Sequence, residues 1–101
     1  MQTQIENSEN TSIIIIEENQ LLGNDNEILR NIVQNSIEQG NKNISIDLSY
    51  VKFISSWAVE GFLHVYKMCK NKNVGFNIRN VNAAVNNVIS KLKLTEILNI
   101  I

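Results

Sequence analysis

Two adjacent serines, Ser55 and Ser56, are the residues of this chain whose type and position best suit chemistry. They follow an apolar segment and precede residues with the spacing of an amphipathic helix, so they should open that helix. Unpaired backbone N–H groups and the positive end of the helix dipole lie at such a position, where an added phosphate is well tolerated. The pair is therefore either a phosphorylation site or simply the helix cap.

No other group of residues has the pattern of a catalytic centre. The one cysteine, Cys69, falls on an apolar helix stripe, which indicates a packed thiol rather than a nucleophile. Glu60 and His64 lie one helical turn apart, but a metal site would need further ligands and the chain has no second histidine. Without a Ser/His/Asp set or a glycine-rich phosphate loop, we expect a non-enzymatic protein with no metal and no cofactor.

Length and composition indicate a single globular domain over residues 1–101, since 44% of the residues are hydrophobic and 19% are charged. The formal net charge is −1 and no basic stripe is present, which argues against nucleic acid as a partner. The polar start of the chain does not resemble a signal peptide, and no apolar run approaches the length of a membrane span. We therefore expect a cytoplasmic protein that does not insert into a membrane.

Strands and helices are expected to alternate along the chain. The strands should cover 2–6, 11–17, 42–48 and 74–79, and a fifth is possible within 94–101. Helices should run over 27–39, from Ser55 or Ser56 to about Asn71, and from a cap at Asn80 or Asn82. This order favours an α/β fold with a mixed four- to five-stranded sheet. Each helix has one apolar stripe, so the three should pack mainly on one face.

The segment 47–54 carries a family resemblance. It reads Asp-Leu-Ser-Tyr-Val-Lys-Phe-Ile and is followed by the serine pair. This resembles the signature of STAS domains, the fold of bacterial anti-sigma-factor antagonists, usually written Asp-Leu-Ser-x-Val-x-Phe-Ile-Asp-Ser-Ser-Gly-Leu. The segment 80–88 is similar to a second family segment, and the resemblance extends from 11 to 98. It implies a STAS-like fold with the same order of strands and helices.

The resemblance also implies a phosphorylation switch, and here the chain departs from the pattern. In the family, a partner kinase phosphorylates the second serine of Asp-Ser-Ser-Gly. Aligned without a gap, Ser55 replaces the acidic residue, Ser56 the first serine, Trp57 the phosphoacceptor and Ala58 the glycine, and an indole cannot be phosphorylated. A one-residue gap would instead make Ser56 the possible phosphosite. The loop after Gly23 is shorter than in typical antagonists, which also argues against conventional kinase recognition.

We therefore expect a protein-binding regulator that resembles an anti-sigma-factor antagonist and lacks the usual phosphoserine off-switch. The partner implied by the resemblance is an anti-sigma factor of the serine-kinase type. The alternative is a STAS subunit of a larger assembly, such as a lipid-transport ABC system or a stressosome-like scaffold. Trp57 is either an anchor for the partner or a core residue that folds back onto the sheet edge. The expected partner-binding residues lie at the start of the second helix and just before the first: Asn24, Asp25, Ser55, Ser56, Trp57, Val59 and Glu60.

Overall fold

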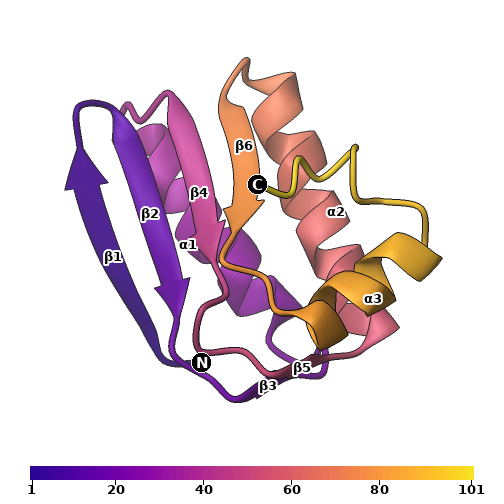
Figure 1. Cartoon of the computed structure of the whole chain (residues 1–101). Coiled ribbons are helices and arrows are strands. Elements are labelled where there is room, and N and C mark those ends of the chain that lie inside the picture. Colours follow the sequence, from indigo (N-terminus) through magenta and orange to yellow (C-terminus); the bar gives the residue numbers. More distant parts are fainter.

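The computed structural model describes all residues 1–101 and contains three helices and six strands (Figure 1). The helices are α1 (Asn26–Glu38), α2 (Ser56–Asn71) and α3 (Ala83–Lys91). The strands are β1 (Thr3–Ser8), β2 (Thr11–Ile16), β3 (Gln20–Leu21), β4 (Asn43–Asp47), β5 (Phe53–Ile54) and β6 (Gly75–Arg79). The expected α/β fold is confirmed, and β3 and β5 are two short strands that the sequence pattern did not predict.

Four of the strands form one mixed sheet in the order β1-β2-β4-β6. The β1–β2 hairpin is antiparallel, whereas β2, β4 and β6 run parallel to one another. The short strands β3 and β5 form a separate parallel pair. The end of the chain adds no strand, because only an isolated bridge joins Ile100 to Ile78 in β6.

The two faces of the four-stranded sheet differ in chemistry because alternate strand residues point to opposite sides. One face is apolar and packs against α1 and α2, as expected, while α3 contacts mainly β5 and α2 (Figure 1). The opposite face includes polar pairs such as Ser45 and Asn77, whose side chains share a hydrogen bond. The buried hydrophobic strand residues of the apolar face are Ile14, Ile16, Ile44, Ile46, Phe76 and Ile78.

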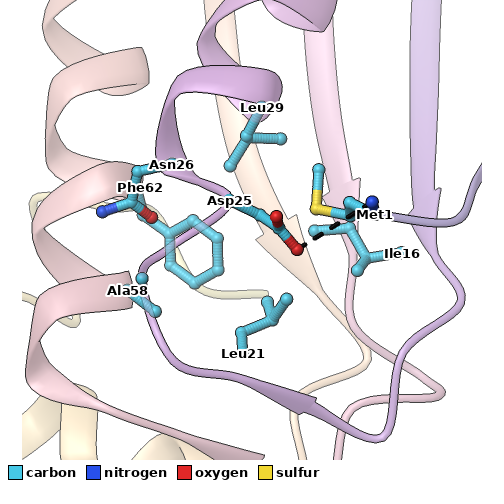
Figure 2. A pocket seen from close by; sticks show the side chains of 9 residues that line it. Met1, Ile16, Leu21, Asp25, Asn26, Leu29, Ala58 and Phe62 are labelled. Atoms are coloured by element: carbon cyan, nitrogen blue, oxygen red, sulfur yellow. Dashed lines mark ion pairs between the residues drawn. The ribbon is translucent and has the colours of Figure 1, made fainter.

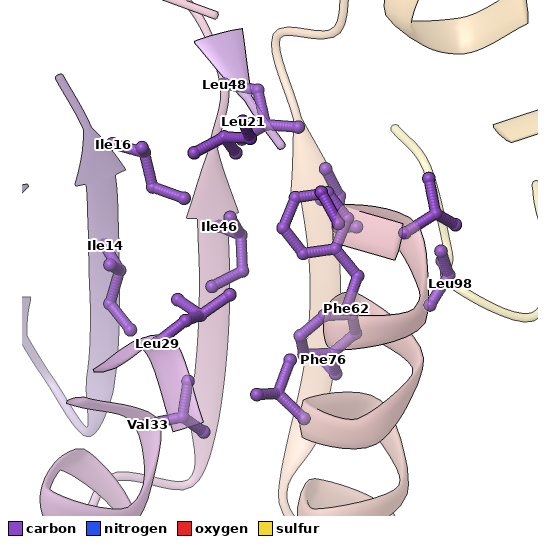
Figure 3. Close-up of a cluster of buried hydrophobic side chains, with 14 of the residues drawn as sticks. Ile14, Ile16, Leu21, Leu29, Val33, Ile46, Leu48, Phe62, Phe76 and Leu98 are labelled. Carbon is purple, nitrogen blue, oxygen red and sulfur yellow. The ribbon is translucent and has the colours of Figure 1, made fainter. Parts of the chain in front are cut away.

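The hydrophobic core fills the space between this apolar face and the helices. Near the start of α1, Leu21, Leu29 and Phe62 meet from three different elements (Figure 2). Val33 continues the buried stripe of α1, and Leu98 adds a contact from the C-terminal segment (Figure 3). Val85 and Ile89 add contacts from α3, so the core joins the sheet, all three helices and the end of the chain into one unit.

Several tight turns depend on asparagine. Six non-glycine residues have a positive φ, and four of them are asparagines: Asn10, Asn73, Asn80 and Asn99. The left-handed conformation is costly for most residues, and asparagine tolerates it best after glycine. Asparagine therefore forms turns in a chain that has only four glycines and no proline.

A buried carboxylate links the ends of β4 and β6. Asp47 accepts hydrogen bonds from the backbone N–H of Ser49 at 2.9 Å, from Nδ2 of Asn80 at 2.9 Å and from Nε of Arg79 at 3.1 Å. Burial alone would raise the pKa of Asp47, but these hydrogen bonds outweigh it and hold the pKa below its ordinary value. Asp47 thus fixes the start of the loop that leads to β5 and α2.

Asp47 should make the fold sensitive to acid. Its pKa is lower in the folded chain than in the unfolded chain, so the unfolded state takes up the proton first as the pH falls. The stabilisation is present above the unfolded value of about 4 and is lost as the pH drops below it. We expect Asp47→Asn to lower the free energy of unfolding at pH 7 by about 1–3 kcal/mol and to flatten the acid limb of the stability curve. Urea melts from pH 7 to pH 2 measure both effects, and parallel curves for the two proteins would contradict the prediction.

The core assignment predicts large losses for truncation. Leu29 is 3% exposed and Phe62 is 1% exposed, so Leu29→Ala or Phe62→Ala should lower the free energy of unfolding by about 2–5 kcal/mol. Ile28 precedes Leu29 on α1 but is 43% exposed, and Ile28→Ala should therefore cost less than about 0.5 kcal/mol. Denaturant melts of the three variants test the assignment, which similar losses at positions 28 and 29 would refute.

Candidate functional site

Ser55, rather than Ser56, is the cap of α2. Its Oγ accepts a hydrogen bond from the N–H of Ala58 at 3.2 Å. The same hydroxyl donates a hydrogen bond to the carbonyl of Leu22 at 2.8 Å. The hydroxyl of Ser55 therefore holds the start of α2 against the segment that follows β3.

Ser56 is the first residue of α2 and is exposed. Its position beside the unpaired N–H groups of the helix start is the one expected for a tolerated phosphate. Glu60 lies one turn further along the helix, so the carboxylate and a phosphate on Ser56 would be neighbours on the same side of α2. The helix dipole and Glu60 thus act in opposite directions on any negative charge at Ser56.

Trp57 is 56% exposed and is not a core residue. Its side chain lies against Gly23, where an added Cβ would overlap the indole ring. Gly23 also has a φ of +104°, a conformation that side-chain-bearing residues rarely adopt. The glycine is therefore required both by its own backbone and by the approach of the indole.

Asn26 ties the beginning of α1 to α2. Its Nδ2 donates a hydrogen bond to the carbonyl of Trp57 at 2.9 Å, and its side chain fills the space above Gly61. Asp25 occupies the cap position of α1, but its side chain makes no capping hydrogen bond and its carboxylate lies 3.9 Å from the amino group of Met1. The segment before α1 and the first turns of α2 are thus adjacent.

Residues of these two segments, together with Phe53 of β5, form what we call the α2-start surface. It consists of Leu22, Asn24, Asp25, Phe53, Ser56, Trp57 and Glu60. Asp25 is only half-buried, and the other members are exposed. Leu22 and Phe53 were not predicted: Leu22 follows the buried Leu21 and Phe53 precedes the buried Ile54, but the strands β3 and β5 have two residues each and are too short to show a period.

Val59 has to be removed from the expected partner-binding residues. It is fully buried, and it lies on the apolar stripe of α2 that faces the core. Its side chain packs beneath the surface because that stripe covers the sheet. Ser55 is half-buried and acts as the cap described above.

A small cavity lies beneath the α2-start surface (Figure 2). Its volume is about 10 Å³, which leaves room for no more than about one water molecule. Met1 packs against its apolar walls, and Asp25 is at its rim. The cavity is therefore better described as imperfect packing under the surface than as a ligand site.

The remaining chemistry-bearing groups are structural. Cys69 is fully buried, and burial raises the pKa of its thiol to about 11. The thiol therefore stays protonated at neutral pH, as expected for a packed cysteine. No three residues among the histidine, cysteine and acidic side chains are grouped so that they could hold a metal ion.

The fold and the strand–loop–helix geometry of residues 43–71 define an α/β domain of the STAS type. The STAS domain family matches residues 2–101, so the chain belongs to this family. No curated protein is similar enough to give a match. No helix of the chain combines the length and apolar character that crossing a membrane requires.

Solved structures of similar fold include three antagonists. A putative anti-sigma factor antagonist from Thermotoga maritima has a TM-score of 0.80 and 20% identity, over 97% of this chain and 84% of that one. An anti-sigma factor antagonist from Mycobacterium paratuberculosis has a TM-score of 0.83 and 18% identity, over 98% and 83%. The anti-sigma factor antagonist SpoIIAA in its unphosphorylated form has a TM-score of 0.80 and 19% identity, over 99% and 88%.

The contact between Gly23 and Trp57 can be tested with Gly40 as a control. Both glycines have a positive φ, but a Cβ at Gly40 would meet nothing within 4 Å. Gly23→Ala and Gly40→Ala should each lower the free energy of unfolding by about 1–3 kcal/mol through backbone strain. Only Gly23→Ala should also displace the indole. Because Trp57 is the single tryptophan, its fluorescence emission reports the displacement, and identical spectra for both variants would contradict the contact.

Proposed function

We propose that this protein is a regulator of the anti-sigma-factor-antagonist type that binds an anti-sigma factor of the serine-kinase type through the α2-start surface. The observation that carries the proposal is the exposed indole of Trp57, held in place by Gly23 at the first turn of α2. Tryptophan is enriched among residues that dominate binding energies, because it offers a large apolar contact together with one N–H donor. The fold shared with known antagonists is consistent with this role.

We further propose that binding is constitutive, without a phosphoserine off-switch. Trp57 has no hydroxyl, and the hydroxyl of Ser55 is engaged in two hydrogen bonds that connect α2 to Leu22. A phosphate on Ser56 would face the carboxylate of Glu60 one turn away, which opposes the favourable effect of the helix dipole. These three features all disfavour a switch at the start of α2.

The alternative is that the same surface docks onto a larger assembly as a dedicated subunit. Affinity capture from the source cells separates the two functions. An anti-sigma factor with a kinase fold bound to the wild-type protein supports the first proposal. A transport ATPase or a scaffold protein would support the alternative and contradict the first proposal.

Truncation of the indole should weaken binding while leaving the fold intact. We expect Trp57→Ala to weaken binding of the captured partner by about 2 kcal/mol or more, which is roughly 30-fold in the dissociation constant. Ile97→Ala is a matched control, because Ile97 is an exposed large apolar residue of the C-terminal segment that is not a member of the α2-start surface. Calorimetric titration of the partner with both variants measures the difference. Equal affinities for the two variants would place the interface elsewhere.

The absence of a switch has a separate test. After incubation with the captured kinase and ATP, the intact mass of the wild-type protein should remain unchanged. Ser56→Ala is the control that would abolish any signal from the one exposed serine at the start of α2. Stoichiometric phosphate on Ser56 would contradict constitutive binding and would favour a switch at that residue.

A further inference from the structure

The two edge strands of the four-stranded sheet, β6 and β1, differ in whether another part of the chain pairs with their outer backbone groups. At the β6 edge, the end of the chain pairs with the strand: the N–H of Ile101 donates to the carbonyl of Ile78, and the N–H of Ile78 donates to the carbonyl of Asn99. Nδ2 of Asn99 also donates to the carbonyl of Phe76. At the other edge, β1 has β2 as its only strand partner, and no element lies along its outer side (Figure 1).

The hairpin register identifies the backbone groups that β1 presents outward. The N–H of Glu17 donates to the carbonyl of Gln2, and hydrogen-bonded pairs alternate with non-bonded pairs along an antiparallel ladder. Gln4, Glu6 and Ser8 therefore direct their N–H and C=O groups toward β2. The N–H and C=O groups of the alternate residues point away from the sheet, and these residues are Thr3, Ile5 and Asn7.

This edge lacks the features by which edge strands usually avoid pairing. Such strands commonly carry lysine, proline or a bulge. β1 has neither lysine nor proline, its register with β2 is unbroken over all six residues, and Glu6 is its single charged side chain. Ile5 is 44% exposed, on the same face of the sheet as the buried Ile14. The edge therefore combines unpaired backbone groups with an exposed apolar side chain.

We propose that β1 pairs with β1 of a second copy of this chain, antiparallel and with Ile5 on the two-fold axis. In this register, Ile5 lies opposite Ile5 of the second copy, and Thr3 lies opposite Asn7. Every outward N–H and C=O of the three residues then has a partner. The two Ile5 side chains lie side by side, and Gln4 of each copy lies opposite Glu6 of the other, where an amide can donate to the carboxylate.

Other symmetric registers fit less well. A two-fold axis at Glu6 would place two carboxylates directly opposite each other, which is destabilising. An axis at Thr3, Gln4 or Asn7 would leave part of β1 unpaired. The register centred on Ile5 is thus the one that pairs the whole strand without a clash of charge. β1 is not part of the α2-start surface, so this proposal is independent of the proposed function.

The test begins with sedimentation velocity of the full chain over a dilution series. A single short strand gives an interface at the small end of the range for specific complexes, so we expect a weak and reversible dimer. Gln4→Lys places a cation opposite Glu6 at both ends of the pairing and should tighten the dimer several-fold at low salt. Gln4→Glu places two carboxylates together and should weaken the dimer by a similar factor.

Two further measurements locate the interface. Ile28→Lys changes an equally exposed isoleucine on α1 and should leave the dimer fraction unchanged. Hydrogen exchange should slow with increasing protein concentration at the amides of Thr3, Ile5 and Asn7, whereas the amides of Gln4 and Glu6 are already bonded to β2. A protein that stays monomeric with freely exchanging edge amides would overturn the proposal and leave the edge to a strand of another protein. Equal shifts for both Gln4 variants would overturn it as well.

Discussion

One hydroxyl group holds the candidate surface together. Ser55 accepts the hydrogen bond that begins α2 and donates another to the carbonyl of Leu22, while its own N–H donates to the carbonyl of Leu21 at 2.9 Å. These bonds join two segments that are more than thirty residues apart in the chain. The packing of Trp57 against Gly23 and the hydrogen bond from Asn26 are possible because that junction is made. A modification that occupied the hydroxyl of Ser55 would have to break the junction first.

Much of the fold could be predicted because its signals are local and periodic. The apolar stripes of the helices, the isoleucine run of β2 and the alternation in β4 each repeat over enough residues to be recognised. The strands β3 and β5 have two residues each, which is too short for a period, so the sequence pattern did not predict them. Val59 shows the strength of the helical period: its place on the apolar stripe of α2 determined its burial, despite its nearness to the expected surface.

The candidate site was less predictable because its geometry depends on contacts between distant segments. Ser55 and Ser56 are equally plausible caps from sequence, and the choice between them follows from the position of the Leu22 carbonyl. The exposure of Trp57 likewise depends on the backbone of Gly23, thirty-four residues earlier in the chain. Local patterns identified the loop and the helix start, whereas only the tertiary contacts determine which of their side chains face solvent.

The asparagine turns have a consequence for the thermodynamics of the chain. At Asn73, Asn80 and Asn99, a glycine would adopt the same left-handed backbone with less local strain. Glycine, however, leaves the unfolded chain with more conformations to lose, and replacing it by a residue with a side chain reduces that entropy. An asparagine at these turns therefore adds a small strain to the native state but reduces the conformational entropy that the unfolded chain loses on folding. In a chain that has no proline, the turn asparagines thus restrict the conformations of the unfolded state.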